Sequence, residues 1–204
     1  MVIEEKDFPW PQKGDHLFVG GEDWYYNAVF NGQLDNLSLY AVGYKRAGKM
    51  LVEAVVKSRR NHDSLVFPIA FVYRQYLELC IKQLIRDSKR LLDDASGFPP
   101  THKITELWKT CRPLFNQVEL DVGDQVLDEI EELITEFAEV DEESYAFRYP
   151  TDKMNNPSLP DLSCVNLPNL AEVIKKMANF LEAVSWQISV NLEQKQECGV
   201  EVEF

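Results

Sequence analysis

Three charged side chains recur at intervals of four residues inside the most apolar stretch of the chain. Arg74, Glu78 and Lys82 would lie along one side of an α-helix, beside a wide apolar surface. A charge in such a place needs a partner, because burial without one is costly. Two interpretations stay open, namely ion pairing within the helix and the polar edge of a binding site.

A second group of candidate residues follows later, in a segment rich in aromatic side chains. Arg148 is flanked by Phe147 and Tyr149, and Pro150 comes next. A guanidinium group is suited to binding phosphate, and a neighbouring ring can stack on a base. The alternative is that Arg148 pairs with a carboxylate of the core, while the two rings anchor the loop.

A third candidate is the pair His102-Lys103, at the start of a predicted helix. A helix N-terminus with basic side chains can bind an anion, although an exposed helix start has the same sequence. For acid–base chemistry the candidate catalytic residues are Glu78, His102 and Arg148. Glu78 or His102 would act as the base, and Arg148 would stabilise charge on a phosphorane.

The charge distribution limits what kind of partner the protein has. The net charge is -13, which excludes a protein that coats nucleic acid through bulk positive charge. Residues 45–112, however, have a net charge of +7, between segments of -5 and -15. This basic middle either presents a positive face to a phosphate-bearing partner or is covered by the acidic final third.

Several known motifs are absent from the sequence. It contains no GxxxxGK[ST] loop, no GxGxxG and no GxSxG, and its four cysteines form no CxxC pair. With three scattered histidines, we expect no metal site and no cofactor. The acidic N-terminus lacks the features of an export signal, and no apolar run is long enough for a membrane helix. We therefore expect a cytoplasmic protein that does not span a membrane.

Hydrophobic periodicity predicts an all-α antiparallel bundle of about five helices in a single domain, residues 1–204. An aromatic-rich arm, residues 1–33, is expected to pack onto the bundle, residues 34–193, and a tail follows at 194–204. Ser64 and Thr101 are the predicted N-caps of the second and third helices, and Asn169 with Glu172 forms a predicted capping box. The predicted helices span residues 34–57, 64–92, 101–115, 121–138 and 169–193, with a long irregular loop at 140–168.

The segment from Phe67-Pro68 through Tyr73-Arg74-Gln75-Tyr76-Leu77-Glu78-Leu79 to Lys82, followed by His102–Trp108 and Phe147–Pro150, resembles bacterial HEPN-like proteins. That resemblance implies a helical bundle, often a dimer, acting in a toxin–antitoxin or phage-defence setting. Catalytic members cleave RNA without metal through an Arg followed four to six residues later by a His. None of His16, His62 and His102 has an arginine at that distance before it.

Three functional hypotheses follow. The first is a HEPN-like module that binds a nucleotide, RNA or a partner chain, with a site drawn from Arg74, Glu78, Lys82, His102, Arg148 and Tyr149. The second is a metal-independent ribonuclease with a non-standard site at Glu78, His102 and Arg148. The third is a structural or assembly protein, in which the charge segregation drives homodimer formation or pairing with a basic partner.

Overall fold

The computed structural model describes residues 10–29 and 36–200 of the chain, which divides into two units, residues 1–35 and 36–204. In the first unit, a 3₁₀ turn spans Trp24–Tyr26, and the Asp23 carboxylate accepts a hydrogen bond from the Tyr25 N–H. The Asn27 side chain bonds both the N–H and the carbonyl of Gly21. Packing of this arm on the bundle stays a prediction, and residues 1–9 and 30–33 lie outside the described residues.

The second unit confirms the all-α prediction. In the described part of this unit, five helices and no strand are present. The helices are α1 (Leu37–Ser58), α2 (His62–Leu91), α3 (Ile104–Gln117), α4 (Asp124–Asp141) and α5 (Leu167–Val200). Residues 34 and 35 of the predicted first helix, and 201–204 of the predicted tail, lie outside the described residues.

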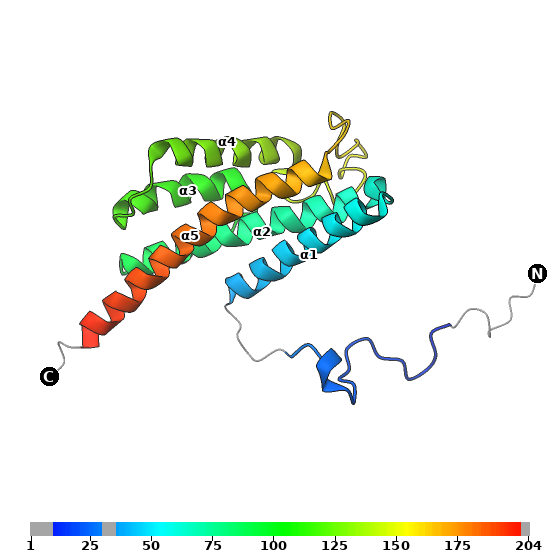
Figure 1. Ribbon diagram of the computed structural model, residues 1–204, viewed down its shortest axis with the longest axis horizontal. Helices are drawn as coiled ribbons and strands as arrows, with labels where there is room; N and C mark the ends of the chain where they lie inside the picture. The colour runs from blue at the N-terminus through cyan, green and yellow to red at the C-terminus, as the bar shows by residue number, and fades with distance from the viewer. Residues whose placement is uncertain (1–9, 30–35, 201–204) are drawn as a thin grey trace, which may run out of the picture. The chain divides into compact units, whose positions relative to one another are not determined.

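Helix α2 is the centre of the bundle. It packs against α1, α3 and α5, while α4 packs on α3 (Figure 1). Because it is enclosed by three neighbours, it is buried over most of its circumference, as its sequence predicts. Helix α2 is long and apolar enough to cross a membrane. The central helix of a bundle has the same length and composition, so this property does not distinguish the two.

The segment between α2 and α3 runs back along α2. Phe98 lies next to Lys82, with Nζ 5.5 Å from the ring centroid, and His102 lies beside Glu78, one helical turn earlier. Helix α3 therefore begins near the middle of α2. This return path brings the predicted site residue His102 against the charged row of α2.

One of two glycines in α1 is explained by a close helix contact. A Cβ atom at Gly48 would lie 2.5 Å from the ring of Tyr73 on α2, so only glycine fits there. At Gly43 a Cβ atom would meet nothing within 4 Å, so a close helix approach, which the sequence also suggests for this glycine, does not explain it.

Several predicted helix ends are wrong by two or three residues. Helix α2 begins at His62, because Asn61 adopts a left-handed conformation (φ 62°), and Ser64 instead donates its hydroxyl to the Asn61 carbonyl. Thr101 accepts from the Lys103 N–H, ahead of the first helical residue of α3.

Helix α5 also differs from its prediction at both ends. It begins at Leu167, where Asn166 accepts a hydrogen bond from the Asn169 N–H, so the predicted capping box at Asn169 is wrong. It then continues to Val200, into the tail at 194–204, whose structure the sequence left open. In α4, Val126 is 41% exposed, although its position on the helical wheel predicted that it points inward.

Candidate functional site

Arg74, Glu78 and Lys82 do lie along one side of α2, and all three are buried. Nη1 of Arg74 is 3.3 Å from Oε2 of Glu78, and Nζ of Lys82 is 2.7 Å from Oε1. The ion pairing that the spacing allowed is therefore present. Burial makes these pairs different from surface pairs, because removing one member would leave a charge unpaired in the interior.

The Arg74 side chain holds together three segments of the chain. It is 0% exposed, and it donates hydrogen bonds to the carbonyls of His102, Asp141 and Glu142 at 2.5, 3.1 and 2.7 Å. Burial lowers the pKa of the guanidinium, and the carboxylates of Glu78, Asp141 and Glu142 oppose that effect. Two of these carbonyls belong to the C-terminal end of α4, where a positive charge stabilises the helix. Arg74 thus fixes the corner that follows α4.

His102 is the exposed member of this group. Its Nδ1 atom is 2.9 Å from Oε1 of Glu78, while its side chain is 73% exposed. In a neutral imidazole that donates a hydrogen bond from Nδ1–H to the Glu78 carboxylate, Nε2 is the unprotonated nitrogen. A carboxylate that fixes the histidine tautomer is an arrangement that suits a general base or an anion contact.

Arg148 and Tyr149 lie in a second cluster, beside a different turn of α2. The Cζ atom of Arg148 is 5.8, 5.9 and 5.6 Å from the ring centroids of Phe71, Tyr145 and Tyr149. Its Nε atom donates to the Ser144 carbonyl at 2.6 Å. Its two Nη groups have no hydrogen-bond partner among the residues that the structure describes, and no carboxylate there pairs with it.

The loop that carries Arg148 is held from within. The Asp141 carboxylate, at the end of α4, accepts hydrogen bonds from the N–H groups of Tyr145 and Ala146 at 2.6 and 2.9 Å. Ser144 has a positive φ of 58° and accepts a hydrogen bond from Gln75 of α2 at 2.6 Å. Phe147 is buried, so its neighbours Arg148 and Tyr149 are turned outward.

The six predicted site residues therefore fall into two clusters. Arg74, Glu78, Lys82 and His102 form one, while Arg148 and Tyr149 join the other around Phe71. Both clusters attach to the corner at residues 141–144, the first through Arg74 and the second through Nε of Arg148.

Sequence reasoning missed the residues that build this corner, which are Gln75, Asp141, Glu142 and Ser144. Asp141 and Glu142 end a strongly acidic helix, so their sequence context is that of a solvated face. Only the buried side chains of α2 reveal their role. In the described part of the chain, no group of three or more His, Cys, Asp or Glu side chains is arranged to hold a metal ion.

Comparison with protein families, with curated proteins and with solved structures finds no significant match to this chain. Function is therefore argued from the geometry of the two clusters.

Proposed function

We propose that the cluster around Arg148 binds a nucleotide or a short segment of single-stranded RNA. Arg148 would hold a phosphate through its Nη groups, and Tyr149 would stack on a base. The observation that carries this proposal is the state of Arg148, whose Nε is anchored while both Nη groups have no protein partner among the described residues. An anchored side chain loses little entropy on binding, which favours affinity.

The surroundings of Arg148 support this assignment. Tyr149 is 50% exposed and available for stacking, and its ring lies 4.8 Å from that of Tyr145. The acidic net charge of the chain fits a discrete site of this kind better than a broad basic surface. The resemblance to HEPN-like proteins is part of the proposal, and with it a cytoplasmic homodimer in a defence or toxin–antitoxin setting.

Fluorescence anisotropy with a fluorescein-labelled single-stranded RNA, with unlabelled nucleotides as competitors, tests the proposal at low and moderate salt. We expect Arg148→Ala and Tyr149→Ala each to weaken binding by about tenfold, in line with the loss of one stacking or charged contact. Matched controls are Arg90→Ala and Tyr40→Ala, because both side chains are exposed elsewhere on the bundle. Equal affinity of wild type and Arg148→Ala would refute the assignment.

Glu78 and His102 favour a second candidate, a metal-independent ribonuclease. In it, Nε2 of His102 would accept the proton of a ribose 2′-hydroxyl as that oxygen attacks phosphorus, and Glu78 would hold the ring. The P–O5′ bond breaks, the 5′-oxygen leaves with a proton taken from water, and a 2′,3′-cyclic phosphate is formed. The observation that favours it is the 2.9 Å contact between the buried Glu78 carboxylate and the exposed imidazole. Arg148 lies in the other cluster and has no assigned part in this step.

The ribonuclease candidate is tested by incubating labelled RNA with the wild type and His102→Ala in the presence of a chelator. Loss of cleavage in the variant supports it. Equal cleavage by both proteins would assign the activity to a contaminant. His16→Ala is the matched control, since His16 lies in the N-terminal unit.

A further inference from the structure

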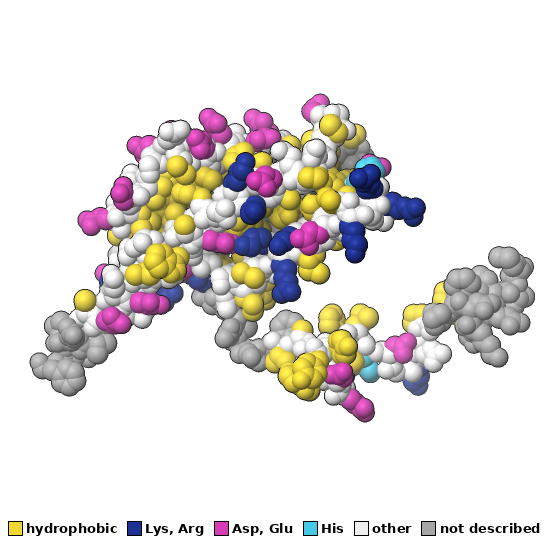
Figure 2. All heavy atoms as spheres, viewed as in Figure 1, with side chains coloured by type: hydrophobic (Ala, Val, Ile, Leu, Met, Phe, Trp, Pro, Cys, Tyr) yellow, Lys and Arg dark blue, Asp and Glu magenta, His cyan; other side chains and the backbone are white. Residues whose placement is uncertain are grey.

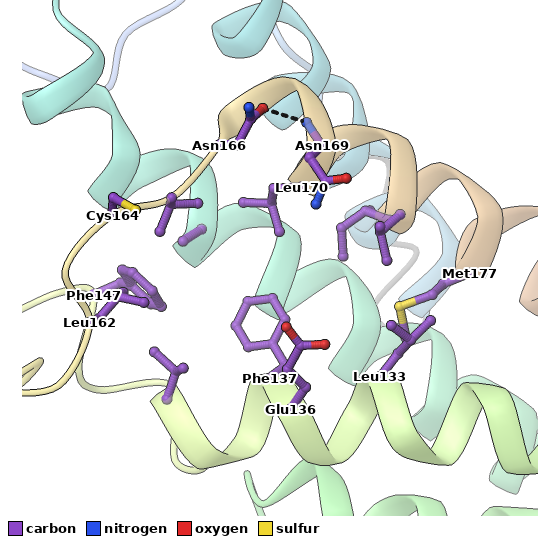
Figure 3. Close-up of a pocket in the computed structure, with 15 residues that line it drawn as sticks. Leu133, Glu136, Phe137, Phe147, Leu162, Cys164, Asn166, Asn169, Leu170 and Met177 are labelled. Atoms are coloured by element: carbon purple, nitrogen blue, oxygen red, sulfur yellow. Dashed lines mark hydrogen bonds between the residues drawn. The ribbon is translucent and has the colours of Figure 1, made fainter.

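An apolar groove lies between α4 and α5 (Figure 3). It encloses a cavity of about 300 Å³, with Leu133 and Phe137 of α4 on one wall and Val173 and Met177 of α5 on the other. Phe147, from the loop between these helices, closes one end. Since α4 packs mainly on α3, no helix among the described residues 36–200 fills the space between α4 and α5.

The polar groups of the groove do not form a site for a small molecule. Such sites use a few polar groups that converge on the ligand. Here the Asn166 side chain is already engaged with the Asn169 N–H at the start of α5, as the dashed line in Figure 3 marks. Glu136 lies on the rim and is exposed. The groove therefore offers an elongated apolar surface between two helices, with acidic side chains along its α4 edge.

That edge is strongly acidic. Residues 124–143 contain ten acidic side chains and no basic one. Glu136 lines the groove, and Glu132 and Glu139 lie within one helical turn of it on the neighbouring face of α4. All three are exposed and have no ion-pair partner within the described ranges 10–29 and 36–200. Like charges three or four residues apart destabilise a helix, so a cationic partner would relieve a repulsion that the free protein retains. Figure 2 shows this acidic row along α4, above a band of hydrophobic side chains that lies between α4 and α5.

We propose that this groove binds a basic amphipathic helix of another protein. The apolar side of that helix would cover Leu133, Phe137 and Val173, and its Lys or Arg side chains would pair with the glutamates along α4. The walls extend over residues 133–140 of α4 and 169–177 of α5, at least two helical turns each, which suits a short helical segment. The residues that would contact this helix differ from those proposed to contact a nucleotide, Arg148 and Tyr149.

The probe is a fluorescein-labelled peptide of Leu and Lys, with leucine at positions i, i+3, i+4 and i+7, and the second probe is the same peptide with Glu in place of Lys. Anisotropy is measured with the full chain at two salt concentrations. We expect the basic peptide to bind at least tenfold more tightly than the acidic one. Val173→Glu should abolish this preference, while Val56→Glu, at an exposed position of α1, should preserve it.

A variant that changes only exposed charges is needed as well, because such a variant should remain folded and its effect on binding cannot then be explained by unfolding. The triple variant Glu132→Gln, Glu136→Gln, Glu139→Gln should weaken binding of the basic peptide. The loss of affinity should be about tenfold larger than the loss caused by Glu197→Gln, at the far end of α5. Equal weakening by both would mean that charge alone attracts the peptide and would overturn the proposal. An apolar dye that the peptide cannot displace would assign the groove to a small molecule instead. A dimer that Val173→Glu dissociates would assign it to a second copy of the chain.

Discussion

Oε1 of Glu78 lies 2.9 Å from Nδ1 of His102 and 2.7 Å from the ammonium Nζ of Lys82, while Oε2 faces the guanidinium of Arg74. Glu78 is only 2% exposed, so it supplies the negative charge that makes this group of cations tolerable in the interior. The carboxylate is thus needed for stability before any chemistry at His102 is considered.

Replacing Glu78 with glutamine should therefore destabilise the bundle strongly. Glu78→Gln keeps the shape but removes the only carboxylate among the described residues that pairs directly with Arg74 and Lys82, and we expect a loss of about 3–5 kcal/mol in the free energy of unfolding. Urea denaturation measures it. Glu132→Gln, at an exposed position of α4, is the control and should change the free energy by less than about 0.5 kcal/mol. A loss below about 1 kcal/mol for Glu78→Gln would contradict the assigned role.

Arg74→Lys should loosen the corner after α4 rather than unfold the protein. A single ammonium group lacks the fork with which Arg74 reaches the carbonyls of His102, Asp141 and Glu142 together. We expect faster amide hydrogen exchange at residues 142–149, read by mass spectrometry, with unchanged exchange in the middle of α5. Arg90→Lys provides the control, since Arg90 is largely exposed. Unchanged exchange at the corner would show that the three carbonyl contacts contribute little.

Two glycines of α1 should respond to alanine with opposite signs. At Gly48 the added methyl group meets the Tyr73 ring at 2.5 Å, so we expect Gly48→Ala to destabilise the protein by about 1–3 kcal/mol. At Gly43 it meets nothing within 4 Å, so Gly43→Ala should stabilise it by about 0.5–1 kcal/mol through helix propensity. Thermal unfolding of both variants gives the comparison. Equal effects would mean that the α1–α2 approach is wider than described.

Two of the four cysteines should react with a thiol reagent in the folded protein, and the other two should not. Burial raises the pKa of the Cys80 thiol to about 12 and also raises the pKa of Cys111, whereas Cys164 and Cys198 are exposed. At pH 8 a thiol reagent should therefore modify two residues rapidly in the folded protein and four after denaturation. Rapid modification of Cys111 in the folded protein would contradict its burial.

The same shifts predict how stability depends on pH. In the unfolded chain a thiol ionises near pH 8.5, but Cys80 and Cys111 keep their protons in the fold, so the folded state binds more protons above that pH. Stability should accordingly fall as pH rises from about 9, by about 1.4 kcal/mol per pH unit for each buried thiol. Urea unfolding between pH 8 and 10 measures the slope, which Cys80→Ala should reduce and Cys164→Ala should not.

Local periodicity determined the helical architecture of this protein. Apolar side chains three and four residues apart predict which face of each helix is inward, because that spacing holds wherever the helix lies in space. In α3 the predicted inward residues are all buried, and the Arg74–Glu78–Lys82 row follows from the same rule. The helix ends are less certain, because Asn61 and Asn166 satisfy terminal groups in ways that neighbouring residues do not dictate.

Only the tertiary structure decided which candidate residues meet. His102 reaches Glu78 because residues 92–103 return along α2, and Arg148 meets Phe71 because the corner at 141–144 is fixed by Arg74 and Gln75. Both contacts join positions far apart in the chain, and no spacing within one helix predicts them. Both contacts depend on where the irregular segments end in space. Those positions are set by buried groups on α2, which must form hydrogen bonds with the loops. The predicted site residues therefore lie in two clusters rather than in one site.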